Sequence, residues 1–228
     1  MRTYVWLIGM IILVLAAACS PSTPAQESKP AIQPDDFVVL PCRNVVAARP
    51  CALVIAGGKR VLFGAPSGAA TSFDQADLKQ LDAVILFSLR AIDVEGLDDV
   101  RNHSWRAGRD QSLLVIGPSG LEDFVTAINK AYEQPDALRI VEDGIPPGGF
   151  DAAVLLAVVA VPGQIVFDTG DLRIERQPAG YKVSYGQAEP LVLTTCGATS
   201  AREEGVLISC LEDDPDIAWP VAQTIFIQ

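Results

Sequence analysis

Short apolar runs separated by turn residues open the folded part of the chain. The runs 37–40, 53–55 and 60–63 are too short for helices and consist mainly of branched or aromatic side chains, so each predicts a strand. The pair Gly57-Gly58 lies between the second and third runs and is typical of a hairpin turn. The pattern therefore predicts that the domain begins with an antiparallel sheet.

The middle of the chain alternates between buried strands and helices. The runs 83–87 and 113–116 are continuously apolar, as in strands buried on both faces. A short helix is expected between them, at about 96–100.

Two capping patterns predict the main helices of this region. Ser72 with Gln75 three residues later predicts a helix that ends near Leu81. Ser119 begins a second such pattern, which predicts a helix to about Tyr132 and assigns Ser119 to a helix cap and not to a nucleophile.

The last third of the chain is rich in predicted strands. They are 152–161, 164–167, 172–176, 181–185, 191–194 and 206–210. Strands at both ends with helices between them predict an α/β fold of sheets covered by helices.

The N-terminus predicts export and lipid attachment. Arg2 precedes an apolar run that is shorter than the roughly 20 residues of a membrane-spanning helix. Small residues then lead to Cys19, and this resembles a bacterial lipobox, which implies a signal peptide of residues 1–18 and lipidation at Cys19. An ordinary signal peptide with a chance cysteine is the alternative. The lipobox implies a membrane anchor in the cell envelope, on the outer membrane facing the periplasm in a Gram-negative cell.

Residues 19–35 are dominated by Pro, Ser, Gln and charged side chains and predict a disordered tether. The domain is therefore expected over 36–228. The net charge of −11 disfavours nucleic acid as a partner, since the basic residues are scattered along the sequence.

Four cysteines follow the tether, and export permits disulfides between them. Their spacing suggests the local pairs Cys42–Cys51 and Cys196–Cys210, although four cysteines allow three connectivities. A thiolate metal site is the alternative, but the sequence has no Cys-x-x-Cys spacing and no partner histidines.

The order of these motifs resembles the metallo-β-lactamase fold, in particular its ribonuclease Z and arylsulfatase-like branch. The matching positions are Leu81-Asp82-Ala83-Val84, Glu95-Gly96-Leu97, Trp105, Gly108-Arg109, Gly117-Pro118, Gly120 and 178–183. The resemblance covers about 36–210 and implies an αββα sandwich of two mixed sheets. It also implies a hydrolase site in which imidazoles and carboxylates hold one or two divalent metals.

The residues of the metal motif depart from that family. Ser88 and Arg90 lie where the motif has its first two histidines, Ile92 replaces its Asp, and Asp93 replaces its third His. Gly64 stands for the Asp of the earlier glycine loop. These positions form a degenerate motif, for which we expect no metal and no cofactor.

Two further positions of the family pattern also lack ligands. The later His falls at about Arg176–Gln177, and the bridging Asp falls within 195–198, where no carboxylate occurs. The one histidine of the chain, His103, lies outside the motif and is expected to be a polar loop residue. A lone catalytic base or an adventitious metal ligand is the alternative.

An acidic cluster lies close to the degenerate motif. Asp93, Glu95, Asp98 and Asp99 offer oxygen ligands for Ca²⁺ or Mg²⁺. The alternative is a solvated loop with Arg90 or Arg101 as the counter-charge.

Three functions follow from these observations. The first is a non-catalytic binding or structural module at the envelope, with an unknown protein or small-molecule ligand. The second is a hydrolase with a rebuilt metal-free site around Ser88, Arg90 and Asp93. The third is an unrelated β-rich lipoprotein.

Overall fold

A computed structural model describes residues 31–45, 49–196, 205–210 and 217–228. The predicted signal peptide, Cys19 and most of the tether lie outside the described residues. Among the helices that are described, none has the length and apolar character needed to span a bilayer.

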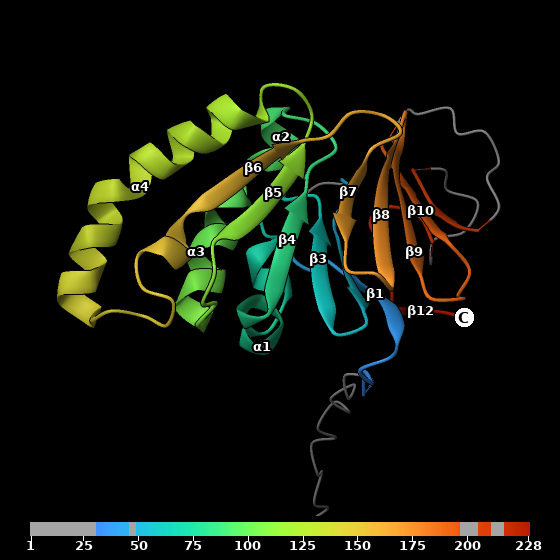
Figure 1. The fold of residues 1–228 in the computed structure, drawn as a ribbon, viewed down its shortest axis with the longest axis horizontal. Coiled ribbons are helices and arrows are strands. Elements are labelled where there is room, and N and C mark those ends of the chain that lie inside the picture. Colours follow the sequence, from blue (N-terminus) through green and yellow to red (C-terminus); the bar gives the residue numbers. More distant parts are fainter. Residues whose placement is uncertain (1–30, 46–48, 197–204, 211–216) are drawn as a thin grey trace, which may run out of the picture. The chain divides into compact units, whose positions relative to one another are not determined.

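Two mixed β-sheets face each other in the domain (Figure 1). The first has seven strands in the order β12 (Ile225–Ile227), β1 (Phe37–Pro41), β2 (Ala52–Ala56), β3 (Lys59–Phe63), β4 (Leu81–Ile85), β5 (Leu113–Gly117) and β6 (Leu155–Val159). The second has five strands in the order β11 (Val206–Ile208), β10 (Leu191–Thr194), β9 (Gly180–Tyr185), β8 (Leu172–Gln177) and β7 (Ile165–Asp168). The strands β1 to β3 pair antiparallel, and β3 to β6 pair parallel.

The helices flank the seven-stranded sheet (Figure 1). They are α1 (Gln75–Lys79), α2 (Ala91–Val94), α3 (Leu97–Ala107) and α4 (Leu121–Asp143), with short 3-10 helices at Ala70–Ser72 and Asp151–Ala153. This architecture confirms the expected α/β sandwich of two mixed sheets with flanking helices.

The first sheet separates two apolar cores. In β1, Val39 faces the space between the sheets, whereas its neighbour Val38 packs in the layer under the helices. Because adjacent side chains point to opposite faces, a strand covered on both faces must be apolar at every position. This explains why all five residues of β1 are buried.

The predicted helix starts were wrong. Ser72 belongs to the 3-10 helix, and the carboxylate of Asp74 caps α1 by accepting a hydrogen bond from the Asp77 backbone at 3.0 Å. The helix ends at Lys79, so Leu81 begins β4 instead of ending a helix. Gly120, not Ser119, is the cap residue of α4, and no side chain caps that helix.

The helix α4 is longer than its capping pattern and apolar face predicted. It continues past Tyr132 and through Pro135 to Asp143. Asn129 of α4 also covers the outer edge of β6, because its side-chain amide bonds both the backbone N–H and the carbonyl of Leu155 at 2.9 Å. The amide thus occupies the place of a neighbouring strand at this position.

Two disulfides join strand ends, in the local pairing that the spacing suggested. Cys42, just after β1, bonds Cys51, just before β2. Cys196, just after β10, bonds Cys210, just after β11. The strand β12, which extends the first sheet beyond β1, was not predicted.

Candidate functional site

The degenerate motif lies at the carboxyl ends of β3 and β4. Since parallel strands end at the same edge of a sheet, Gly64 after β3 and the loop 88–93 after β4 become neighbours. The Gly64 amide donates to the carbonyl of Ile85 at 2.7 Å, and the Ala65 amide points at the carbonyl of Asp93 at 3.4 Å. The fold therefore brings most of the predicted motif positions together at one edge.

A buried aspartate is the centre of this edge. The Ser88 hydroxyl donates to Oδ2 of Asp93 at 2.5 Å, and Nε of Arg90 donates to the same oxygen at 3.1 Å. The Arg90 backbone N–H donates in turn to Oγ of Ser88 at 3.2 Å. The hydroxyl of Ser88 is thus engaged both as donor and as acceptor, and it fixes the loop that carries Arg90.

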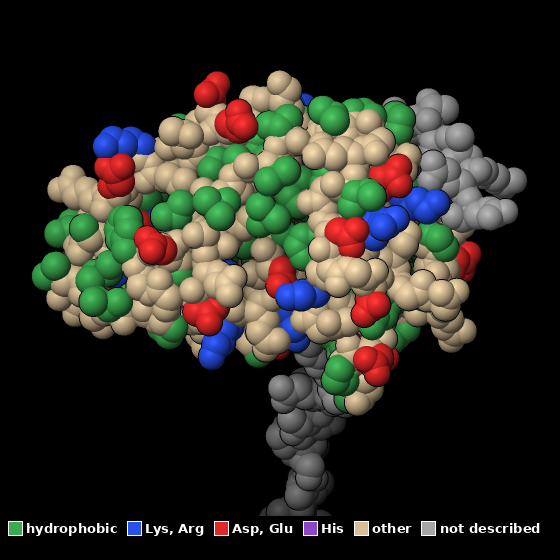
Figure 2. Space-filling model, in the orientation of Figure 1, with side chains coloured by type: hydrophobic (Ala, Val, Ile, Leu, Met, Phe, Trp, Pro, Cys, Tyr) green, Lys and Arg blue, Asp and Glu red, His purple; other side chains and the backbone are tan. Residues whose placement is uncertain are grey.

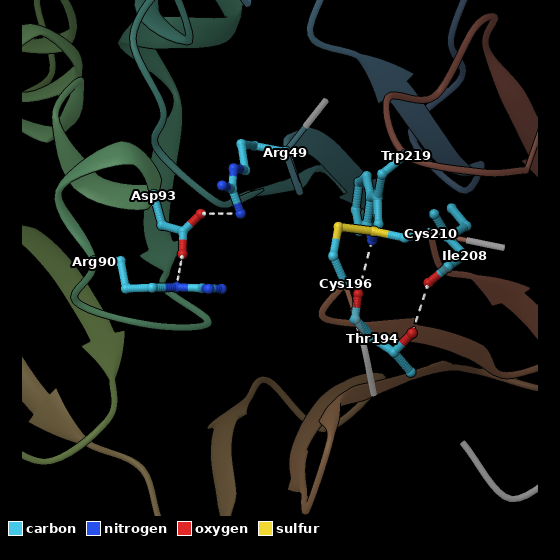
Figure 3. The surroundings of a disulfide bond; sticks show 8 residues. All are labelled: Arg49, Arg90, Asp93, Thr194, Cys196, Ile208, Cys210 and Trp219. Carbon is cyan, nitrogen blue, oxygen red and sulfur yellow. Dashed lines mark hydrogen bonds and ion pairs between the residues drawn. A yellow bond between two sulfur atoms is a disulfide. The ribbon is translucent and has the colours of Figure 1, made fainter. Parts of the chain in front are cut away.

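A second arginine approaches the other carboxylate oxygen. Nη1 of Arg49, from the segment before β2, lies 3.7 Å from Oδ1 of Asp93 (Figure 3). Oδ1 is buried and makes no hydrogen bond among the described residues. Nothing in the sequence around Arg49 indicated this contact, because the two residues are far apart in the chain and only the β2–β3–β4 pairing joins them.

The cluster of Arg49, Ser88, Arg90 and Asp93 is called the arginine cluster below. Ile92 follows it in α2 as a half-buried alkyl side chain and adds no donor or acceptor. Among the described residues, no group of three or more His, Cys, Asp and Glu side chains is arranged to hold a metal ion.

An aromatic cluster lies between the sheets next to the motif loop. The Phe87 ring lies 5.5 Å from the Tyr181 ring and 6.1 Å from the Trp219 ring, measured between centroids. The Tyr181 hydroxyl donates to the Leu86 carbonyl at 3.1 Å, so the second sheet is tied to the end of β4. The sequence patterns did not predict that Phe87, Tyr181 and Trp219 would meet, because the three residues come from separate segments that only the sandwich brings together.

Burial of Tyr181 predicts a loss of stability in alkali. Desolvation raises the pKa of this phenol from 10.0 to about 12. Between these two values the unfolded chain releases the proton that the folded chain keeps, so the free energy of unfolding falls as pH rises, by about 2–3 kcal/mol in total from this group. Urea unfolding at pH 9, 10 and 11 should show a smaller pH slope in Tyr181→Phe than in the unchanged protein. Equal pH slopes in the two proteins would contradict the assignment of this stability loss to Tyr181.

The second disulfide lies opposite the arginine cluster. Figure 3 shows Cys196–Cys210 beside Trp219, whose indole N–H donates to the Thr194 carbonyl at 2.8 Å. The disulfide and the indole hydrogen bond thus stabilise the end of the second sheet that lies opposite the arginine cluster.

Other residues singled out in the sequence lie elsewhere or make structural contacts. His103 lies on α3 and not in a loop, with Nδ1 2.9 Å from the Asp99 carbonyl. Asp98 accepts from the Tyr132 hydroxyl at 2.7 Å, so it is a link to α4. Arg176, at the expected place of the later His, lies over the Tyr181 ring at 4.8 Å from its centroid.

The expected counter-charges of the acidic cluster are partly confirmed. Arg90 does pair with Asp93, whereas Arg101 pairs with Asp136 of α4 and not with the acidic loop.

Solved structures show which fold this arrangement belongs to. No protein-family model and no curated protein matches the sequence. The short form of human tRNase Z superposes with a TM-score of 0.57 and 14% identity, over 79% of this chain and 80% of that one. The metallo-β-lactamase fold protein YhfI from Bacillus subtilis superposes with a TM-score of 0.52 and 16% identity, over 77% and 71%.

A third similar structure is the long form of RNase Z from yeast, with a TM-score of 0.51 and 11% identity, over 82% of this chain and 35% of that one. At these identities the likeness concerns the architecture alone. The chain therefore has the metallo-β-lactamase fold.

Proposed function

We propose that this protein is an exported, lipid-anchored envelope protein whose domain is a metal-free, non-catalytic binding module. The arginine cluster is the observation that carries the proposal. This cluster lies at the positions where the family resemblance implies a metal site. Its contacts are hydrogen bonds and ion pairs within the chain.

The donor set does not fit a divalent metal. Zinc needs several imidazole, thiolate or carboxylate ligands, and Asp93 is the one such group among the motif positions Ser88, Arg90, Ile92 and Asp93. A guanidinium stays protonated and repels a dication. Because two arginines already face this carboxylate, they supply the positive charge that a metal would otherwise bring.

The two disulfides support the proposal that the fold is stable without a metal. A structural metal stabilises a fold by binding it, and a disulfide of short span contributes roughly 2–4 kcal/mol. Each of the two bonds here closes a short loop, with separations of 9 and 14 residues. Cross-links at strand ends thus stabilise the sandwich independently of any ion.

Metal analysis tests this proposal. We expect mature protein, purified without chelator and analysed by inductively coupled plasma mass spectrometry, to contain far less than one zinc, manganese or iron per chain. One tightly bound transition metal per chain would overturn the metal-free assignment.

For the anchor, Cys19→Ala is expected to abolish labelling by a radioactive fatty acid and to move the protein from the membrane to the soluble fraction.

One contact favours a hydrolase as the second candidate. The Ser88 hydroxyl lies 2.5 Å from a carboxylate, as a nucleophile lies beside its base. A panel of carboxylic and phosphoric esters, assayed with Ser88→Ala and Asp93→Asn, separates the two functions. Turnover that both substitutions abolish would favour the hydrolase.

A further inference from the structure

We infer that Arg49 and Arg90 form a binding site for a small oxyanion, a carboxylate or a phosphoryl group. This inference rests on the proposed metal-free binding function and names the class of its ligand.

The first argument is that both arginines keep unused donors. Arg90 contacts Asp93 and Ser88 through Nε, and among the described residues its two terminal nitrogens make no hydrogen bond. Its side chain is 61% exposed. Arg49 reaches Asp93 at 3.7 Å, which is longer than a hydrogen bond, so its N–H groups are also free within that part of the chain.

The second argument is that the arginines are already positioned. The Asp93 side chain is only 10% exposed, and its two oxygens face different guanidinium groups. Ser88 fixes the same carboxylate and the backbone of Arg90. A site whose donors are held in place before binding loses less conformational entropy when the ligand arrives.

The third argument is charge. Two guanidinium groups and one carboxylate leave a local excess of positive charge, on a protein with a net charge of −11. On the face shown in Figure 2, basic side chains mostly lie beside acidic ones. A guanidinium with both terminal nitrogens free can bind a carboxylate or phosphate in a bidentate manner. The half-buried Arg49 adds a second guanidinium, next to the other oxygen of Asp93.

The surroundings of Oδ1 of Asp93, which makes no hydrogen bond among the described residues, favour an anion site over a cation site. Oδ1 is buried, and its neighbour is Arg49. An added cation would have to displace or repel that guanidinium, whereas an anion bound by Arg49 and Arg90 leaves the carboxylate's contacts intact. Asp93 and Ser88 are therefore positioning residues, and the two arginines contact the ligand.

Titration with simple anions tests the inference. The probes are inorganic phosphate and acetate, added separately to ¹⁵N-labelled mature protein at low ionic strength, with the arginine Nε–Hε signals recorded by NMR. We expect saturable shifts of the Arg90 signal with at least one probe, with a dissociation constant of about 1 mM. The probe that binds more tightly identifies the phosphoryl or the carboxylate group as the ligand.

Matched variants show whether the binding is local. Arg49→Gln and Arg90→Gln should each weaken binding about tenfold, and Arg90→Lys should weaken it despite keeping the charge, because a lysine cannot form the bidentate contact. Arg173→Gln is the control: Arg173 is another exposed arginine, on β8, and its Nε lies 3.5 Å from Oδ2 of Asp168 at the end of β7. Each variant's fold is checked by near-ultraviolet circular dichroism.

Two outcomes would overturn the inference: no saturable shift with either probe, or equal weakening by Arg173→Gln. Metal content is measured on the same samples, which separates this inference from the function it rests on. A metal-free protein that ignores both anions refutes the anion site alone, whereas a stoichiometric metal refutes the metal-free function.

Discussion

Asp136→Ala is expected to lower the free energy of unfolding by about 3–5 kcal/mol, because it leaves a buried guanidinium without its partner. Arg101 is 2% exposed and Asp136 is 3% exposed. The terminal nitrogens of Arg101 donate to both carboxylate oxygens of Asp136, and the guanidinium also lies over the Tyr132 ring, 4.7 Å from its centroid. The pair links α3 to the second half of α4.

Urea unfolding followed by circular dichroism measures this loss. Glu133→Ala is the control, since Lys130 and Glu133 form an ion pair on the same helix with side chains 74% and 57% exposed. That pair should contribute no more than about 1 kcal/mol. The double substitution Arg101→Met with Asp136→Leu should recover much of the loss, because it removes both buried charges. Similar losses for Asp136→Ala and Glu133→Ala would contradict the assignment.

The same ion pair explains why the length of α4 exceeds its sequence prediction. The capping pattern and the apolar face predicted an end near Tyr132, and Pro135 lacks the N–H that would continue the helix. Asp136 follows directly and is anchored by Arg101 from another helix. Tertiary contact thus offsets a local breaking signal, and no periodicity within 121–143 contains that information.

The buried strands, in contrast, could be predicted from local sequence patterns. The run 83–87 overlaps β4, which begins and ends two residues earlier, and the run 113–116 lies within β5; a strand covered on both faces has to be largely apolar. The segment 225–227 was missed because a strand so short has too few residues to show a pattern, and its pairing with β1 comes from the far end of the chain.

The candidate site was predictable only in part. Ser88, Arg90 and Asp93 lie within six residues, so one short stretch of sequence contains these three motif positions. Arg49 and Trp219 reach the same edge from distant segments. Ion pairs and ring contacts between distant segments depend on strand order, which a single sequence does not give.

Gly64→Ala is expected to destabilise the fold strongly. Because any side chain at this position needs a Cβ, the same substitution tests whether the carboxylate that the motif lacks could be restored by Gly64→Asp alone. Gly64 has a φ of +80°, and a Cβ there would lie 1.8 Å from the Pro50 carbonyl oxygen. Backbone strain costs about 1–3 kcal/mol at such a position, and overpacking typically adds about 1–3 kcal/mol. Gly64→Asp meets the same obstacle, since its Cβ is in the same place.

Gly163→Ala separates strain from clash. Gly163 has a φ of +84°, but a Cβ there would meet nothing within 4 Å. Thermal and urea unfolding should therefore show a loss of about 1–3 kcal/mol for Gly163→Ala and a larger one for Gly64→Ala. Equal losses would mean that the segment before β2 moves aside at little cost. A larger loss at Gly64 would mean that the close approach of Pro50, next to Arg49, excludes a carboxylate at this position, so that regaining a metal ligand there requires the arginine-bearing segment to move first.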